Sequence, residues 1–234
     1  LRLVGSEMCI RDRNKVMEKR KKMVSLGLAM MFILCICATS CRVSQGFTRD
    51  EESIIGETGQ GIMPLRKITD KSDSLFLRKE ASPLGKAELE SQTFKVLKER
   101  MSATVKDTLD EGVGIAAPQV GISRRVMAVQ RFDKEGEPFE FYVNPVIVSF
   151  SESTVLGKEG CLSVPDVVGT VRRSKQIELS YDDLDSYTLT DGDIRITDEK
   201  VKRRTETVKG YTAIIFQHEI DHLDGILFID KMVE

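Results

Sequence analysis

Apolar residues recur at helical spacing in two stretches of the chain. Between Glu88 and Leu109 they lie three or four residues apart, which predicts an amphipathic helix with one buried stripe. A second helix is predicted from about Tyr211 to Leu223, and Gly225 can adopt the left-handed conformation that ends a helix. The stripe of the first helix consists of Phe94, Leu97, Met101, Val105 and Leu109.

Between these helices the pattern changes to short runs of β-branched and aromatic residues. Gly, Pro and Asp separate the runs, so they predict strands. The predicted strands cover residues 125–132, 139–143, 146–150 and 176–181. Because a helix, several strands and a helix follow one another without βαβ alternation, we expect an α+β fold.

A signal-peptide pattern precedes this body. The basic residues Lys19 to Lys22 are followed by 18 charge-free, mostly apolar residues from Met23 to Ser40. The run Ala38-Thr39-Ser40-Cys41 resembles a bacterial lipoprotein cleavage box. We therefore expect lipidation of Cys41 and a membrane-anchored protein in the cell envelope, periplasmic or outer membrane. The alternative is an uncleaved anchor helix, because 18 residues just suffice to cross a bilayer.

These patterns divide the chain into three parts. Residues 1–41 comprise the lipoprotein-type signal peptide and upstream residues, of which residues 1–16 precede a plausible start at Met17 and are excluded as read-through. Residues 42–60 are polar and lack apolar periodicity, so we expect a tether there. The folded, functional domain is expected over residues 61–234.

Composition and charge exclude several classes of protein. With 41% apolar and 31% charged residues among 234, the chain is typical of one globular domain plus an appendage. Beyond residue 41 it carries 27 basic and 34 acidic residues, a formal charge of −7, so we expect no nucleic-acid binding. Four of the five cysteines precede residue 42, and Cys161 alone follows, which excludes a disulfide-stabilised scaffold.

Both histidines of the chain lie in the segment Gln217-His218-Glu219-Ile220-Asp221-His222. Four residues are about one helical turn, so both imidazoles project from one helix face and can hold one metal ion. Glu219 lies beside them, close enough to reach a water on that metal. The alternative is a chance H-E-x-x-H pattern on a surface helix, which is rare when a chain has two histidines.

A catalytic metal requires a third protein ligand and an open position. Upstream, Cys161 stands in the segment Glu159-Gly160-Cys161-Leu162-Ser163, next to a predicted strand. An isolated cysteine is usually a small buried apolar residue, but a metal would hold this one as a thiolate and protect it from oxidation. The residues after His222 offer only carboxylates, those of Asp224, Asp230 and Glu234.

The segment Gly112 to Gly121 follows the first predicted helix. It contains neither G-x-G-x-x-G nor a Walker lysine, so phosphate binding is a weak interpretation. A helix end followed by a tight turn explains its glycines but not the polar Gln119. The amide NH2 of Gln119 can donate a hydrogen bond to an oxyanion as charge develops on a substrate carbonyl.

Three segments together, residues 112–119, 159–163 and 217–222, resemble the motifs of the peptide deformylases. The likeness extends from about Met63 to the end of the chain, and residues 64–68 and 76–79 are similar to the family's N-terminal strand region. The resemblance implies small antiparallel sheets packed around a central helix that carries the H-E-x-x-H motif. It also implies a metallohydrolase that removes the N-formyl group from formyl-methionyl peptides and releases formate.

The resemblance assigns roles to particular residues. It implies one divalent metal ion, usually Fe²⁺, with Zn²⁺ or Ni²⁺ able to occupy the site. A metal-bound water would lose its proton near neutral pH, and Glu219 would pass that proton to the leaving amine. The implied metal ligands are Cys161, His218 and His222, and the implied catalytic groups are Glu219, Gln119 and the backbone N–H of Leu162.

The N-formyl peptide is expected to bind as an added strand along Val113 to Ala116. Its methionine side chain would enter an apolar pocket, for which Val113, Ile115 and Ile214 are the candidate lining residues, although core packing is the more ordinary role for each. The candidate substrate-binding residues are Val113, Gly114 and Ile115.

The chain departs from the family pattern in four ways. Exported, lipidated members are not the usual form. Where many members carry an arginine this chain has Val168, with Arg172 and Arg173 nearby, so we expect weaker contact with the peptide backbone and a raised KM. Residues 182–207 are highly charged and predict a hairpin insertion. The chain up to Glu234 lacks the long basic C-terminal helix of many members, so we expect no contact with the ribosome. We also expect a monomer.

Two other functions remain open on the sequence. A zinc endopeptidase can share the H-E-x-x-H motif, but its third ligand usually comes from further down the chain, where this sequence offers few candidates. A metal-binding lipoprotein that recognises peptides without catalysis would need neither Glu219 nor Gln119.

Overall fold

The structure is a computed structural model and describes residues 46–56, 61–107, 112–183, 188–190, 193–195 and 202–233. The predicted signal peptide, the alternative anchor helix and the lipidation site Cys41 lie outside the described residues. Among the described helices, none is long and apolar enough to cross a membrane.

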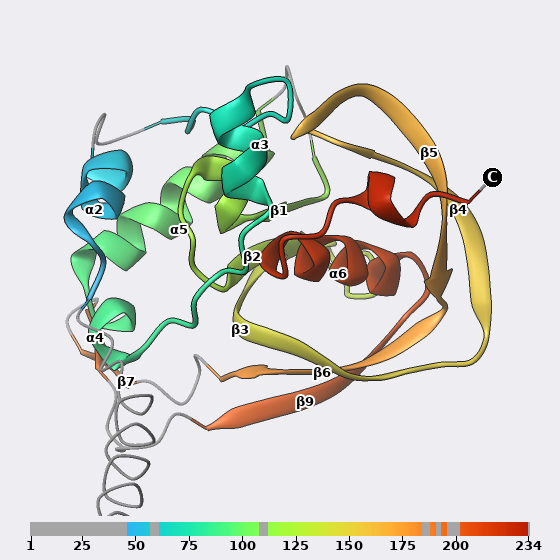
Figure 1. The fold of residues 1–234 in the computed structure, drawn as a ribbon. Helices are drawn as coiled ribbons and strands as arrows, with labels where there is room; N and C mark the ends of the chain where they lie inside the picture. Colours follow the sequence, from blue (N-terminus) through green and yellow to red (C-terminus); the bar gives the residue numbers. More distant parts are fainter. Residues whose placement is uncertain are drawn as a thin grey trace, which may run out of the picture. The chain divides into compact units, whose positions relative to one another are not determined.

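The largest sheet is antiparallel, and its five strands follow the order β1-β2-β3-β6-β9. Strands β4 and β5 form a second antiparallel sheet, and β7 and β8 form a short third one. Helices pack around these sheets, which confirms the predicted α+β fold class (Figure 1). The strand bounds are β1 Gly114–Ala116, β2 Val126–Gln130, β3 Phe139–Phe150, β4 Thr154–Cys161, β5 Val164–Ser174, β6 Gln176–Asp182, β7 Thr188–Thr190, β8 Asp193–Arg195 and β9 Arg203–Lys209.

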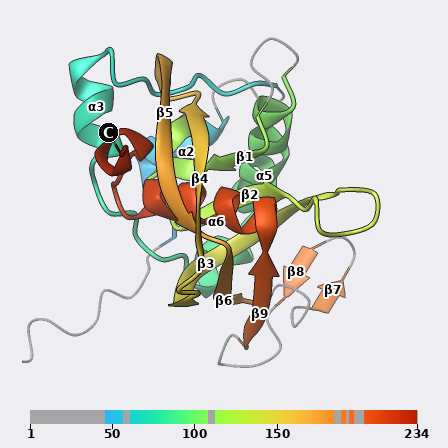
Figure 2. The same cartoon turned by 90° about the vertical axis from the view of Figure 1, so that its right-hand side faces the viewer.

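Helix α6 (Gly210–Leu223) lies in the middle of this arrangement, between the five-stranded sheet and the β4–β5 hairpin (Figures 1 and 2). Ten of its 14 residues are buried, so it meets protein on most of its circumference. Gln217 fixes it to the end of β5: its Nε2 donates to the carbonyl of Ser174 at 2.9 Å, and its Oε1 accepts from the Ser174 N–H at 3.0 Å. The predicted helix is confirmed, and Gly225 follows it with φ +72°.

The first predicted helix is shorter than expected. Helix α5 spans Gln92–Val105, and Ser91 caps it by accepting a hydrogen bond from the Phe94 N–H. A separate short helix, α4 (Lys86–Leu89), precedes it. The predicted stripe is buried, with Phe94, Leu97, Met101 and Val105 each 0% exposed, whereas Leu109 lies outside the described residues.

The predicted tether over residues 42–60 is partly folded. Residues Arg49–Gly56 form helix α2, which packs on α5, so the folded domain begins before residue 61. Phe47, Glu51 and Ile55 are four residues apart and all face inward. This stripe was not predicted because its middle residue, Glu51, is charged. The Glu51 carboxylate accepts a hydrogen bond from Arg124 Nη2 at 2.8 Å, which compensates the cost of burying its charge.

Two of the predicted strands are one. Strand β3 continues through Asn144 and Pro145, where the prediction broke it. Asn144 has φ +49°, and the register against β6 shifts at this point, so the strand bends without ending. Strand β4 was missed because its residues alternate between exposed and half-buried, which leaves no continuous apolar face.

The hairpin predicted over residues 182–207 is confirmed only for β7 and β8, which pair with each other. Strand β9 pairs with β6 from Arg203 to Lys209 and forms an edge of the five-stranded sheet. This strand was not predicted because most of its residues are charged or polar, and Val208 is its one fully buried side chain. The charged part of the insertion therefore extends the sheet that supports α6.

Candidate active site

The two histidines of α6 converge with the cysteine at the end of β4. The ligand atoms of Cys161, His218 and His222 all lie within 4.8 Å of one another. The Sγ of Cys161 is 3.2 Å from Nε2 of His222. Cys161 pairs with Val164 across the tight turn that joins β4 to β5, and this hairpin packs beside α6. The fold thus assembles three side chains that could bind a metal from segments about 60 residues apart.

The two imidazoles of this cluster differ in protonation. Burial lowers the pKa of His222 well below its ordinary value, so its imidazole is neutral and keeps a lone pair. Burial would also lower the pKa of His218, but hydrogen bonds to Cys161 and Glu159 outweigh it and raise this pKa to about 10. At neutral pH His218 is therefore protonated in the absence of an ion, and it would have to release that proton to bind one. One thiol and two imidazoles are a donor set that Fe²⁺, Zn²⁺ and Ni²⁺ accept, so the residues fit one such ion.

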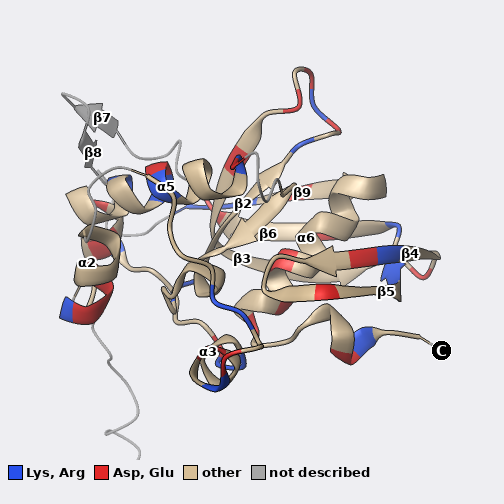
Figure 3. Cartoon of the chain, turned by 90° about the horizontal axis from the view of Figure 1, so that it is seen from above, with Lys and Arg blue, Asp and Glu red and all other residues tan. Residues whose placement is uncertain are grey.

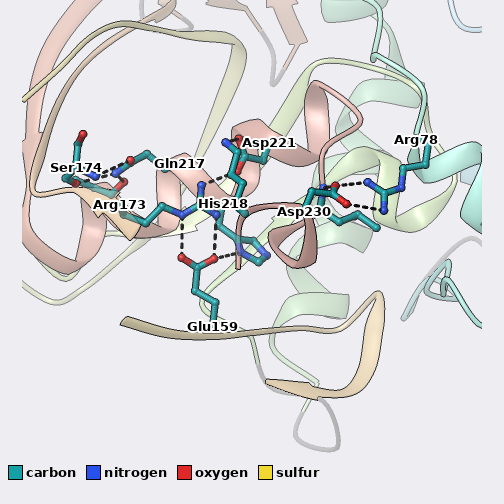
Figure 4. Close-up of polar contacts among 11 residues, drawn as sticks. Arg78, Glu159, Arg173, Ser174, Gln217, His218, Asp221 and Asp230 are labelled. Atoms are coloured by element: carbon teal, nitrogen blue, oxygen red, sulfur yellow. Dashed lines mark hydrogen bonds and ion pairs between the residues drawn. The ribbon is translucent and has the colours of Figure 1, made fainter. Parts of the chain in front are cut away.

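Glu159 holds His218 in place (Figure 4). Its Oε2 is 2.9 Å from Nδ1 of His218, which leaves Nε2 as the ligand atom of that ring. Arg173 Nε donates to Glu159 Oε1 at 2.8 Å, and Arg173 Nη1 donates to Asp221 at 2.5 Å. Burial opposes ionisation of Glu159, but the hydrogen bonds from Arg173 and His218 lower its pKa to about 2. It is therefore a carboxylate at neutral pH.

Sequence reasoning did not assign these supporting roles. Glu159 could have been identified from the sequence, because it lies two residues before Cys161 within a recognised motif. No sequence pattern points to Arg173, since only the pairing of β5 with β4 brings it beside Glu159. Asp221 lies within the helix motif and also accepts from Lys231 Nζ at 2.6 Å, which ties α6 to the last described turn, Phe228–Lys231.

Glu219 lines the same pocket as Cys161 and His218, two of the candidate metal ligands. It is 4% exposed, and its Oε2 has no hydrogen-bond partner among the described residues. Burial raises the pKa of Glu219 to about 7, although the charge of His218 opposes the shift. A Cβ added at Gly114 would lie 2.5 Å from Glu219 Oε1, so β1 approaches the carboxylate as closely as glycine permits. An unpaired carboxylate with such a pKa can accept and return a proton.

Gln119 presents its amide nitrogen to the site. Its Oε1 accepts from the Ala116 N–H at 2.8 Å, which fixes the orientation of the amide. Its Nε2 is then directed at Ser163 Oγ, 3.4 Å away, and at Cys161 Sγ, 3.6 Å away. Leu162 lines the same pocket. The structure therefore brings together every catalytic and metal-ligand residue that the sequence predicted.

The pocket beside these residues has a volume of about 450 Å³. Of the predicted peptide-binding residues, Val113, Gly114 and Ile214 line it. Ile115 does not: it is 0% exposed and packs in the core with α5. Strand side chains alternate between two faces, so Ile115 points away from the face that Gly114 occupies. The prediction that the Ile115 side chain lines the pocket is therefore wrong.

Neither Arg172 nor Arg173 takes the place of the arginine that many members of the resembled family carry where this chain has Val168. Val168 lines the pocket and is 67% exposed. Arg173 is buried and bonded to Glu159 and Asp221. Arg172 lies outside the pocket, and its Nη1 contacts Thr154 Oγ1 at 3.4 Å.

Comparisons with known proteins agree with this site. A family model for polypeptide deformylase matches residues 64–191 and 193–234. A peptide deformylase of Symbiobacterium thermophilum is 38% identical over 161 residues, which cover 69% of this chain and 64% of that protein. The peptide deformylase of Thermoanaerobacter pseudethanolicus is 37% identical over 169 residues, which cover 72% of this chain and 88% of that protein.

Solved structures are similar as well. The class I type b peptide deformylase of Acinetobacter baumannii bound to Met-Ala-Ser has a TM-score of 0.58 and 35% identity, covering 73% of this chain and 98% of that one. The peptide deformylase of Thermotoga maritima has a TM-score of 0.58 and 32% identity, covering 75% of this chain and 100% of that one. Because the family model covers most of the chain and relatives above 30% identity extend over two thirds of it, the chain belongs to the polypeptide deformylase family.

Proposed function

We propose that this chain hydrolyses the N-formyl group of formyl-methionyl peptides and releases formate. One observation carries the proposal: Cys161 and His218 of the Cys/His/His cluster line the same pocket as Glu219, whose Oε2 has no partner among the described residues. Metal binding alone requires no such carboxylate. A hydrolase requires a group that moves a proton at this position.

Cys161, His218 and His222 would hold the metal. A divalent ion bound there supplies a Lewis acid that activates water at neutral pH. We propose Fe²⁺ as the native ion, with Zn²⁺ or Ni²⁺ able to replace it. Glu159 and Arg173 keep the ring of His218 oriented toward the ion, since Glu159 occupies its other nitrogen.

Glu219 moves the proton of the reaction. Its carboxylate takes a proton from the water that attacks the formyl carbon, and the C–N bond then breaks as Glu219 returns the proton to the amine. The products are formate and a peptide with a free N-terminus. The Gln119 Nε2 and the Leu162 N–H donate to the oxyanion that forms between these two steps.

The edge strand β1 offers its backbone to the peptide. The Val113 carbonyl accepts from the Gln130 N–H of β2 at 2.9 Å, so alternation turns the N–H and C=O of Gly114 away from β2. An extended peptide can pair there as an added strand. Val113 and Ile214 line the pocket next to it and would receive the methionine side chain.

Formate release tests this function. Purified, metal-loaded protein should release formate from formyl-Met-Ala-Ser, with one equivalent of free amine for each formate. Casein incubated in parallel should stay intact. Cleavage of casein without formate release would instead indicate the endopeptidase, and neither activity would indicate a metal-binding protein without catalysis.

We further propose that the protein is a monomeric lipoprotein of the cell envelope, anchored through Cys41. The lipoprotein-like cleavage box and the basic, then apolar, leader support this proposal. The domain organisation proposed is a signal segment up to Cys41 and a catalytic domain that includes α2. Formyl peptides that reach the envelope would be its substrates.

A further inference from the structure

A second pocket lies on another face of α6 and shares no lining residue with the active-site pocket. Its volume is about 900 Å³, which is within the range of pockets that hold small ligands. On α6 it is lined by Gln217, Ile220, Asp221 and Asp224, whose spacing of three, four and seven residues defines one helix face. The proposed hydrolysis does not use this pocket.

An uncovered edge of β3 lies beside the second pocket. Val146, Ile147 and Phe150 line the pocket, and β6 pairs with these residues of β3 on one side only. On the other side, β2 and the residue before it cover β3 only as far as Asn144, and no other strand of the described residues continues the pairing. Such an edge presents backbone N–H and C=O groups to which an extended peptide can add.

Glu80 lies at the end of the pocket near the last turn of α6. The N–H of Ala81, the next residue, donates to the Leu223 carbonyl at 2.8 Å. Asp224 lies at the same end, but Arg125 Nη1 donates to its carboxylate at 2.7 Å. Glu80 is exposed, and among the described residues its carboxylate has no hydrogen bond or ion pair. This end of the pocket therefore carries a negative charge that a cation can compensate.

Arg172 lies at the opposite end of the pocket. Its Nη1 donates to Thr154 Oγ1 at 3.4 Å, and Thr154 pairs with Ser174 across β4 and β5. Ser174 is hydrogen-bonded to Gln217, where this face of α6 begins (Figure 4). Within the described part of the chain, Arg172 has no carboxylate partner. This end of the pocket can therefore bind an anion.

The distance between these two ends matches a short peptide. Gln217 and Leu223 are six residues apart, so the two ends are separated by about 9 Å along the helix. Three residues of an extended peptide span about 10 Å. At neutral pH a free peptide carries a positive amine at one end and a carboxylate at the other. The other charges of the pocket compensate one another, since Arg173 and Lys231 both pair with Asp221.

We propose that this second pocket binds a short unmodified peptide of about three residues, with its amine at Glu80, its carboxylate at Arg172 and its backbone beside the uncovered edge of β3. Val146 and Phe150 are 45% and 60% exposed, so apolar side chains of the peptide would pack against them. A formyl peptide lacks the positive amine. The ligand of this pocket therefore differs from the substrate proposed for the active site.

Isothermal titration calorimetry of purified, metal-loaded protein at pH 7 tests the pocket. The probe is the tripeptide Leu-Ala-Leu, compared with its N-acetylated form and its C-terminal amide. We expect each capped peptide to bind about three- to tenfold more weakly, because it lacks one charge-assisted hydrogen bond. Glu80→Gln should remove the preference over the acetylated peptide and keep the preference over the amide. Arg172→Gln should do the reverse, and the preference that each variant keeps shows that it is folded.

Arg49→Gln and Glu52→Gln are matched controls, because both residues are exposed on α2 and lie outside the pocket. They should behave as wild type. Failure of Leu-Ala-Leu to bind, or equal affinity of wild-type protein for the three peptides, would overturn the proposal. Both preferences persisting in Glu80→Gln and in Arg172→Gln would show that the peptide binds elsewhere and would overturn it as well. Formate release is measured separately, so the hydrolytic function does not depend on these outcomes.

Discussion

Glu219 is the buried carboxylate on which the proposed chemistry depends. We expect Glu219→Gln to bind metal normally and to lose nearly all turnover, because the amide keeps the shape of the side chain but cannot accept a proton. General acid/base groups contribute about 10²- to 10⁴-fold to a rate, so a loss in that range is expected. The measurements are formate release and metal content of the same preparation.

Glu152→Gln is a matched control for this variant, since Glu152 is exposed and lies outside the pocket. It should behave as wild type. A Glu219→Gln protein with full metal content and more than a tenth of the wild-type rate would contradict the assignment.

Cys161 supplies the third proposed metal ligand. We expect one metal ion per chain in wild-type protein and weaker binding in Cys161→Ser, because a serine hydroxyl gives up its proton far less readily than a thiol. Metal content after dialysis against a graded series of chelator concentrations measures the difference. Undiminished affinity together with full activity would show that the third ligand lies elsewhere.

At the scale of elements, the position of the proposed catalytic carboxylate of Glu219 depends on how closely β1 approaches α6. We expect Gly114→Ala to displace Glu219, because the new Cβ would lie 2.5 Å from Oε1 and 2.9 Å from both Cγ and Cδ. The turnover number should fall at least about tenfold while metal content is unchanged. Gly157→Ala on β4 is the control, since its Cβ would meet nothing within 4 Å. Equal turnover in the two variants would contradict this role of Gly114.

Helix α2 provides a test of the domain boundary. Ile55 is 1% exposed and belongs to the core around α5. We expect Ile55→Ala to lower the free energy of unfolding by about 2–5 kcal/mol, as truncation of a buried isoleucine does elsewhere. Urea unfolding measures this, with the exposed Glu52→Ala of the same helix as control. No change in Ile55→Ala would restore the interpretation of these residues as a tether.

At the scale of the whole molecule, acidic and basic residues are interspersed along the described elements (Figure 3). Ion pairs such as Arg124–Glu51 and Arg125–Asp224 connect segments far apart in the sequence. These ion pairs help to hold the described elements together. Attachment to a membrane is proposed to come from the leader.

Lipidation is tested in cells. In a bacterial host grown with radiolabelled palmitate, we expect the protein to carry label and to appear in the membrane fraction, because two acyl chains on one cysteine give stable anchoring. Cys41→Ala should lose the label and block cleavage, whereas Cys37→Ala, within the apolar run, should retain the label. Unlabelled cytoplasmic protein with an intact leader would refute the localisation and leave the chemistry of Glu219 unaffected.

Local patterns determined much of this protein without a structure. The spacing of His218 and His222 places both on one face because helical geometry is periodic, and the buried stripe of α5 follows from the same periodicity. Cys161 was identified as a candidate because it is the one cysteine after residue 41. Residues such as Gln119, whose type matches a chemical role, could also be predicted from the sequence together with its resemblance to the family.

Tertiary structure decided the contacts between segments that carry no periodic signal. Arg173 meets Glu159 only when β5 pairs with β4, and Gly114 meets Glu219 only when β1 packs on α6. Ile115 belongs to the core because the edge strand turns that face toward α5. Charged stretches such as α2 and β9 became part of the fold because partners remote in sequence compensate their charges or bury one face. Such pairing free energies depend on three-dimensional proximity, which local sequence does not encode.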